Sequence, residues 1–202
     1  MKFIRDERGM LFVVSAPSGG GKTSLCKEVI KRLPNFEHGV SYTTRKRRPT
    51  EVDGKDYHFV SKEKFMDMVE ADEFVEYAFV HGNYYGTLIQ NFQQAKKMNT
   101  HLVMEIDVQG GKAIKKKYPQ ESILIFLLPP TFETLEKRIK ARGTENQEQI
   151  NTRLQTAKLE LLVANEYDYR VINDDTNRCA KEIMHILKGS ILDEEERTKR
   201  YH

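Results

Sequence analysis

A glycine-rich segment at residues 16–23, with the sequence APSGGGKT, constrains the fold of this chain more than any other feature. It follows an apolar run at residues 10–15 and precedes an amphipathic stretch at residues 22–33 that Pro34 ends. The order strand, glycine-rich loop and helix is typical of a phosphate-binding loop, and this context disfavours an ordinary glycine-rich connection. Ala16 stands where the motif usually has glycine, and its small side chain still permits the turn. The segment therefore predicts a nucleoside triphosphate site.

The residue types in this loop explain how it would hold phosphate. Glycines let the backbone curl so that amide N–H groups point inward, and the N-terminus of the following helix adds positive potential. Lys22 is expected to reach the β and γ phosphates, and the hydroxyl of Thr23 is suited to Mg²⁺. The residues assigned to the triphosphate are Ala16, Pro17, Ser18, Gly19, Gly20, Gly21, Lys22, Thr23 and Ser24.

Short apolar runs alternate with amphipathic stretches along the rest of the chain, which favours βαβ units around a parallel sheet. Further strands are expected at residues 101–107, 122–128 and 169–173, and a helix at residues 176–192 precedes a charged tail that is expected to fray. A chain of 202 residues, 39% apolar and 31% charged, suits one globular domain. The expected fold class is α/β, with a parallel sheet flanked by helices.

Two segments interrupt this alternation. Residues 41–87 predict a small mixed subdomain, with a helix over residues 62–70 and two strands around a Gly82-Asn83 turn. Residues 129–165 predict a pair of helices joined at Arg142-Gly143. The expected core of the single domain, residues 1–202, is then made of residues 1–40, 88–128 and 166–202.

Charge and cysteine content exclude several classes of protein. The chain has 33 Lys and Arg against 30 Asp and Glu, and this net charge of +3 is too small and too interleaved to indicate nucleic acid as a partner. No apolar run approaches the roughly 20 residues that span a bilayer, and the N-terminus lacks the apolar core of a secretory signal. We expect a cytoplasmic protein without a membrane partner. Cys26 and Cys179 are too few for a disulfide framework and lack metal-ligand spacing.

Two charged segments outside the loop are candidates for chemistry. Asp107 ends an expected strand, where ligands collect in doubly wound sheets, and either holds a metal-bound water or a substrate or is an ordinary strand terminus. Residues 45–48 form a run of four cations, RKRR. Together with Tyr57, Tyr84 and Tyr85, their guanidinium groups suit a single phosphate, unless the run is a solvated face or a nucleic-acid patch.

Two further features depend on where isolated charges lie. Glu76 interrupts an apolar strand, and a carboxylate there accepts two hydrogen bonds from the N1–H and N2 amino groups of guanine, which adenine does not offer. The alternative is an outward residue of a half-exposed strand. Arg138 and Arg142 share one helical face, with Arg153 on the next helix. They suit a lid that places cations on a moving phosphoryl group and excludes water, the alternative being ordinary surface arginines.

Taken together, these residues resemble the guanylate kinase family. The resemblance covers about residues 11–185, and its segments occur in the family's order and spacing: SAPSGGGKT, SYTTR, EVDGKDYHFVS, EFVEYA, GNYYGT, EIDVQG, PPTFETLEKRIKARGTE and VINDD. It implies a P-loop NTPase fold with a GMP-binding subdomain at residues 41–87 and an ATP lid at residues 129–165. The implied activity is transfer of the γ-phosphoryl group of ATP to GMP, and also to dGMP, with Mg²⁺ as cofactor.

The resemblance also implies roles for individual residues. Those that hold the GMP phosphate are Arg45, Arg48, Tyr57 and Tyr85, and those that read guanine are Ser41, Glu76, Thr87 and Asp107. Charge on the transferring phosphoryl group is stabilised by Lys22, Arg45, Arg138, Arg142 and Arg153. Thr23 binds Mg²⁺, and Asn173 borders the adenine. Thr87 and Tyr42 stand where the family commonly has serine; Thr87 keeps the hydroxyl, and the role of Tyr42 stays open.

Two other classes of protein remain as alternatives. Guanylate-kinase-like domains also occur in scaffold proteins as catalytically silent modules that bind peptides. The loop lysine, the arginines and Glu76 are all present here, which favours the enzyme. A P-loop kinase with another acceptor is the second alternative, and Glu76 together with the GNYYGT segment disfavours it. The sequence does not distinguish a monomer from a homo-oligomer.

Overall fold

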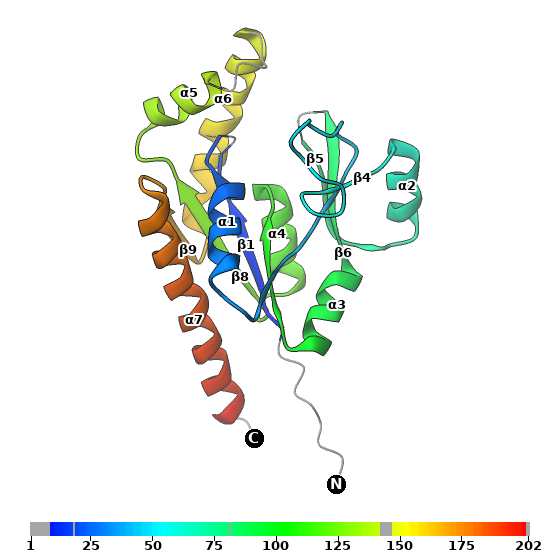
Figure 1. The fold of residues 1–202 in the computed structure, drawn as a ribbon, viewed down its shortest axis with the longest axis vertical. Helices are drawn as coiled ribbons and strands as arrows, with labels where there is room; N and C mark the ends of the chain where they lie inside the picture. Colours follow the sequence, from blue (N-terminus) through cyan, green and yellow to red (C-terminus); the bar gives the residue numbers. More distant parts are fainter. Residues whose placement is uncertain (1–8, 18, 81, 142–146, 201–202) are drawn as a thin grey trace.

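The computed structural model describes residues 9–17, 19–80, 82–141 and 147–200, with the backbone alone over 193–200. Its larger sheet is parallel throughout, with the strand order β2-β7-β1-β8-β9. These strands are β1 (Leu11–Ser15), β2 (Phe36–His38), β7 (His101–Glu105), β8 (Ser122–Leu128) and β9 (Tyr169–Ile172). The order places β1, which leads into the glycine-rich loop, at the centre of the sheet (Figure 1).

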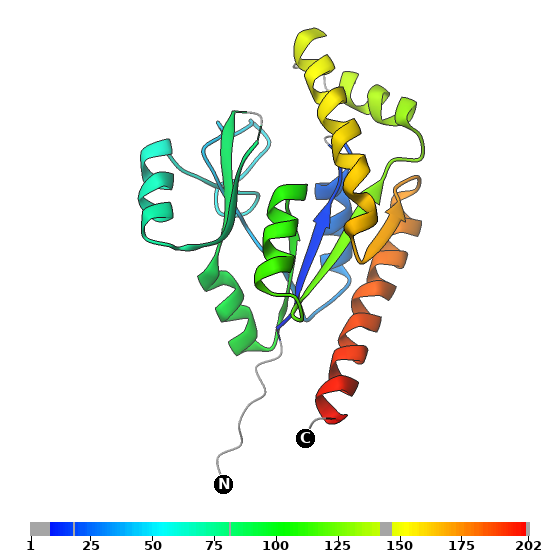
Figure 2. The same ribbon diagram turned by 180° about the vertical axis from the view of Figure 1, so that it is seen from behind.

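Helices cover both faces of this sheet, as Figures 1 and 2 show from opposite sides. One face packs against α1 (Lys22–Lys31) and α7 (Thr176–Arg200), and the other against α3 (Ile89–Met98) and α4 (Val108–Lys117). Side chains of β1 alternate between the two cores and are almost fully buried in both. A continuous apolar strand of this kind is expected only where both faces are covered.

The segment after β2 forms a separate, mixed sheet with the strand order β4-β3-β6-β5. Its elements are β3 (Tyr42–Thr43), β4 (His58–Phe59), α2 (Lys62–Glu70), β5 (Phe74–Val80) and β6 (Asn83–Leu88). Ser61 caps the N-terminus of α2, because its hydroxyl accepts a hydrogen bond from the Lys64 backbone N–H, and the helix packs through Phe65 on Phe74. This sheet meets the main domain where β5 packs on α4.

Two packed helices follow β8, namely α5 (Phe132–Lys140) and α6 (Gln147–Leu162), and a short 3₁₀ helix (Val163–Glu166) leads on to β9. Leu135, Ile139 and Ala157 form the buried contact between the two helices. Figure 1 shows the pair beyond the end of the large sheet at which β1 gives way to the glycine-rich loop. The predicted helix junction at Arg142 and Gly143 lies outside the described residues.

The predicted α/β class, with a helix-flanked parallel sheet and a mixed inserted sheet, is confirmed. Some element bounds were wrong. The last helix does not end at residue 192 but runs to Arg200, so the charged tail is helical. The strand expected at residues 101–107 ends at Glu105, because Asp107 caps the helix that follows. The strand β6 already begins at Asn83, so the hairpin turn precedes this residue. The domain boundaries stay a prediction.

Among the helices that the structure describes, none is long and apolar enough to cross a membrane.

Candidate functional site

The glycine-rich loop joins the carboxyl end of β1 to the N-terminus of α1. Gly19 and Gly21 have φ angles of 86° and 82°, a left-handed conformation that L side chains rarely adopt. Gly20 needs its small size for another reason, because a Cβ atom there would lie 2.6 Å from the Cβ of Ala16. The loop conformation therefore requires the glycines that identified it in the sequence.

Lys22 is folded back over this loop. Its Nζ donates a hydrogen bond to the carbonyl oxygen of Ala16 at 2.9 Å, and burial lowers the pKa of its ammonium group. The ammonium group is thus held against the backbone that forms the turn.

Three parts of the chain meet at the loop. Asn173, which follows β9, donates from Nδ2 to the Gly20 carbonyl oxygen at 2.7 Å, and Arg138 of α5 donates to the Asn173 carbonyl oxygen at 3.0 Å. The side chain of Ile139 lies so near Gly19 that a Cβ atom on the glycine would be 3.0 Å from it. Helix α5 is therefore in contact with the loop. Arg153 lies on α6, one helical turn before the buried Ala157. Ser18 and Arg142 lie outside the described residues.

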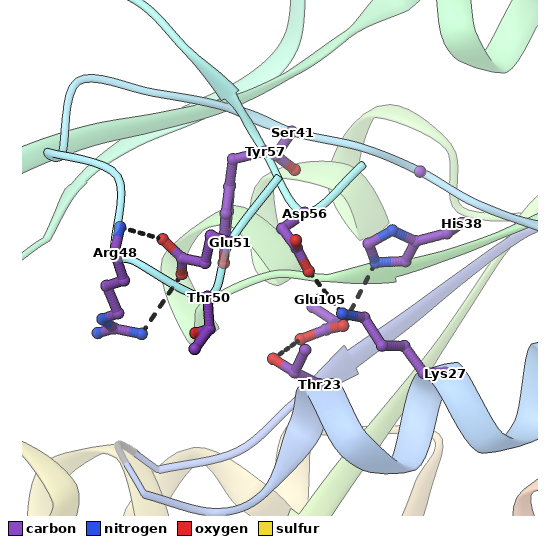
Figure 3. Close-up of a pocket in the computed structure, with 11 residues that line it drawn as sticks. Thr23, Lys27, His38, Ser41, Arg48, Thr50, Glu51, Asp56, Tyr57 and Glu105 are labelled. Atoms are coloured by element: carbon purple, nitrogen blue, oxygen red, sulfur yellow. Dashed lines mark hydrogen bonds and ion pairs between the residues drawn. The ribbon is translucent and has the colours of Figure 1, made fainter. Parts of the chain in front are cut away.

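A residue that the sequence analysis did not select, Glu105, lies opposite the loop. The Thr23 hydroxyl donates to Glu105 Oε2 at 2.6 Å, and Nε2 of His38 lies 3.3 Å from Oε1 (Figure 3). The Glu105 side chain is 7% exposed. Only the order of the strands in the sheet indicates this residue, because Glu105 ends β7, which is the parallel neighbour of β1.

Asp107, which the sequence analysis did select, has a structural function at this position. Its Oδ1 accepts the backbone N–H groups of Gln109 and Gly110, both at 2.8 Å, so it is the N-cap of α4. Burial is the main cause of the raised pKa of Glu76, and the charge of Asp107 adds to it. Of the two acidic residues in this segment, Glu105 is therefore the one that contacts Thr23.

Glu76, Thr87 and Ser41 come together in the mixed sheet. Glu76 on β5 faces Thr87 on β6 in register, and the Thr87 hydroxyl lies 3.0 Å from the Ser41 hydroxyl. Glu76 is 7% exposed, and this burial raises its pKa to about 7, against the opposing effect of hydrogen bonds from Thr87. A Cβ atom at Gly110 of α4 would lie 2.4 Å from Glu76 Oε2. The alternative, in which Glu76 faces outward from a half-exposed strand, is excluded.

The basic run lies in the connection between β3 and β4. Its guanidinium groups are organised by Glu51, whose carboxylate accepts from Arg45 at 2.8 and 3.0 Å and from the Arg48 backbone N–H at 2.8 Å. The rings of Tyr57 and Tyr85 approach to 5.9 Å between centroids, and the Arg45 guanidinium lies 5.4 Å from the Tyr57 ring centroid. Burial raises the pKa of Tyr57, so its hydroxyl stays a donor at neutral pH. Arg45 is thus partly buried within a folded cluster, whereas Lys46, Arg47 and Arg48 are exposed, so the run is in part a solvated face.

A pocket lies between the start of α1 and the connection that carries the basic run, and Figure 3 shows the residues that line it. The predicted residues that line it are Thr23 from the loop side and Ser41, Arg48 and Tyr57 from the mixed sheet side. The others that line it are Lys27, His38, Gly39, Thr50, Glu51, Asp56 and Glu105. The pocket therefore brings the phosphate-binding loop face to face with the basic run. Of the guanine-reading candidates, Ser41 lines the pocket, Thr87 contacts Ser41, and Glu76 is paired with Thr87.

The chemistry of Thr23 and Glu105 fits a magnesium ion. A hydroxyl and a carboxylate are hard oxygen donors of the kind that Mg²⁺ prefers. Glu105 Oε1 is buried and accepts no hydrogen bond of good geometry, although His38 Nε2 lies 3.3 Å away. Both side chains lie at the pocket, next to the loop expected to hold phosphates.

Comparisons with known proteins agree with this geometry. Residues 8–190 match the family described as Guanylate kinase. The guanylate kinase of Geobacter sulfurreducens is 43% identical over 192 residues, covering 95% of this chain and 92% of its own. That of Thermotoga maritima is 44% identical over 182 residues, covering 90% and 87%. The crystal structure of guanylate kinase from Anaplasma phagocytophilum has a TM-score of 0.77 at 29% identity, covering 90% of this chain and 85% of that one.

Proposed function

The chain belongs to the guanylate kinase family, and from this premise we propose that it transfers the γ-phosphoryl group of ATP to GMP in the pocket between the two sheets. One observation carries the proposal: Thr23 of the phosphate-binding loop and Arg48 and Tyr57 of the basic run line the same pocket. A donor phosphate site and an acceptor phosphate site therefore face each other, as direct transfer between two nucleotides requires.

The mixed sheet is the acceptor side. Ser41, Glu76 and Thr87 form a hydrogen-bonded group in which the ionised Glu76 would accept from N1–H and the N2 amino group of guanine. Asp107 stands at the edge of this group as the cap of α4. The residues proposed for the GMP phosphate are Arg45, Arg48, Tyr57 and Tyr85. A preference for guanine over adenine follows, because adenine would leave the buried carboxylate unpaired.

The glycine-rich loop is the donor side. Residues 16–24 would wrap the ATP phosphates, and Asn173, bonded to Gly20, would border the adenine. Thr23 and Glu105 are the residues that would hold Mg²⁺. When bound, Mg²⁺ neutralises charge on the phosphate oxygens as the transfer proceeds.

The transfer needs positioning and positive charge more than proton chemistry. A phosphate oxygen of GMP is already nucleophilic, so no side chain has to act as a strong general base, and no covalent intermediate forms. The cations proposed to stabilise the moving phosphoryl group are Lys22, Arg45, Arg138, Arg142 and Arg153. The contact of Arg138 with Asn173 brings the first of the lid arginines to the loop.

A coupled assay for nucleoside diphosphate with Mg-ATP tests donor, acceptor and catalysis together. We expect turnover with GMP and dGMP and none with AMP, CMP or UMP. Turnover with another monophosphate would contradict the assignment of Glu76. No turnover with any acceptor, from protein shown to be folded, would favour the peptide-binding module. The expected cytoplasmic location and the absence of nucleic-acid binding stay predictions.

A further inference from the structure

A pair of residues outside the proposed machinery joins the two sides of the pocket. Lys27 of α1 lies one helical turn after Thr23, on the same face of the helix. Its Nζ contacts Asp56 Oδ1 at 2.5 Å, as Figure 3 shows. Lys27 belongs to the helix that starts at the phosphate-binding loop, whereas Asp56 belongs to the connection that carries the basic run.

We call this connection, residues 44–57, the arginine loop. Hydrogen bonds between its own residues hold it together. Glu51 holds both the Arg45 side chain and the Arg48 backbone. Asp56 Oδ2 accepts the Val52 backbone N–H at 2.8 Å, which ties Asp56 to the residue beside Glu51. A displacement of Asp56 would therefore carry the arginines with it.

Asp56 is positioned more firmly than Lys27. Its side chain is 13% exposed, both of its oxygens are engaged, and the pKa of its carboxyl is lowered first by the hydrogen bond from Lys27. The Lys27 side chain is 49% exposed. Because the Lys27 side chain is exposed, this ion pair adds little to the stability of the fold. Its main effect would therefore be on the distance between the two elements that it joins.

We propose that the Lys27–Asp56 ion pair is a positioning contact that sets how closely the arginine loop, and with it the acceptor phosphate, approaches the phosphate-binding loop. Neither residue needs to touch the reacting atoms. In-line transfer depends steeply on the separation of donor and acceptor, so a contact that sets this separation acts on the rate. The inference rests on the proposed function, because it takes the arginine loop to hold GMP.

The kinetic test uses Lys27→Met, which keeps the aliphatic stem, and Asp56→Asn, which keeps the acceptor for Val52 N–H. Each is expected to lower kcat about tenfold, with KM for ATP unchanged within about twofold. The double variant should be no slower than either single one, because both remove the same contact. Lys31→Met, which removes another exposed cation from α1, is the matched control and should match the parent protein.

Two kinetic outcomes would overturn the proposal. If Lys27→Met were slow and Asp56→Asn were normal, Lys27 would act on the phosphates directly. If the losses multiplied in the double variant, the two residues would act independently.

A distance measurement tests the contact without turnover. Nitroxide labels at Lys31→Cys on α1 and Lys46→Cys on the arginine loop report the separation of the two elements, since the native Cys26 and Cys179 are buried. Asp56→Asn should lengthen or broaden the distribution measured by pulsed electron resonance. An unchanged distribution would overturn the proposal. If the distribution changed but the parent protein phosphorylated no acceptor, the proposed function would be wrong while the contact remained.

Discussion

The proposed donor side and the proposed acceptor side of the pocket are built from different parts of the chain. On the donor side, one contiguous loop supplies backbone groups, and its shape depends on Gly19 and Gly21 in left-handed conformations. On the acceptor side, side chains come from separate strands, such as Glu76 on β5 and Thr87 on β6. A site made of backbone should fail when a methyl group is added, whereas a site made of side chains should fail by degrees as their functional groups are changed.

Replacing Lys22 tests this contrast most severely, because Lys22 contributes a side chain to the donor side, where backbone groups dominate. We expect Lys22→Ala to lower kcat by about 10³-fold, since it removes a cation held against the loop. Thermal unfolding should stay near that of the parent protein. Lys31→Ala, on the same helix, is the control. A near-parental kcat for Lys22→Ala would show that backbone groups alone support the transfer.

Gly21→Ala tests the backbone itself. The φ angle of 82° is strained for alanine, and the new Cβ atom would lie 2.8 Å from Asn173 Nδ2. We expect affinity for ATP, measured by calorimetry, to fall about 10²-fold while affinity for GMP is kept. The matched control is Gly82→Ala, with a φ angle of 80° and no atom within 4 Å of the new Cβ. Equal losses of ATP affinity in both variants would mean general strain and not a local effect.

Glu76→Gln tests the acceptor side. An amide in place of the carboxylate loses one acceptor oxygen and the charge, so KM for GMP should rise about 50-fold. KM for ATP should change little. Glu73→Gln, at an exposed position just before β5, controls for the loss of charge. An unchanged KM for GMP would move guanine recognition away from this strand.

The pH dependence of GMP binding should reveal a smaller effect of the same residue. With a pKa of about 7, Glu76 is protonated below pH 7 and cannot accept both guanine donors. The dissociation constant of GMP should rise about tenfold per pH unit below 7 and level off above it. The Gln variant should lack this slope. A parent slope that survives in the Gln variant would assign the titration to another group.

GMP binding should weaken as Glu76 is protonated, whereas the stability of the folded protein should increase. The folded-state pKa of Glu76 lies above its ordinary value of 4.5, so between pH 4.5 and 7 the folded state binds more protons than the unfolded state. Stability contributed by this group is therefore present below pH 4.5 and is lost as pH rises through 7. Glu76→Gln should melt roughly 5 °C above the parent protein at pH 8 and together with it near pH 4.

The contrast also explains what could be predicted from sequence. The phosphate-binding loop is local, since its residues are neighbours in the chain and their glycines are required by its own backbone. The same holds for the β5–β6 hairpin, which the alternation of side chains revealed. Glu105 was missed because its contact with Thr23 exists only through the pairing of β7 with β1. No local pattern contains that information.

Helix α4 was not predicted as a separate element for a similar reason. Its sequence, VQGGKAIKKK, has two glycines near the start, which disfavour a helix. It forms because Asp107 caps its N-terminus and Ile114 is buried in the core. The same packing places Gly110 against Glu76, so tertiary contacts outweigh local propensity here.

The contact between Gly110 and Glu76 also limits how the protein can evolve. A Cβ atom at residue 110 would lie 2.4 Å from Glu76 Oε2 and 2.4 Å from Ile106 Cγ2, so another amino acid fits there only if both of these side chains shift. Replacing Glu76 by a smaller residue would in turn leave a gap over the glycine. The effect of a substitution at residue 110 should therefore depend on which side chains occupy positions 76 and 106, and a descendant of this chain that recognised another base through residue 76 would keep a glycine at 110 unless Ile106 also changed.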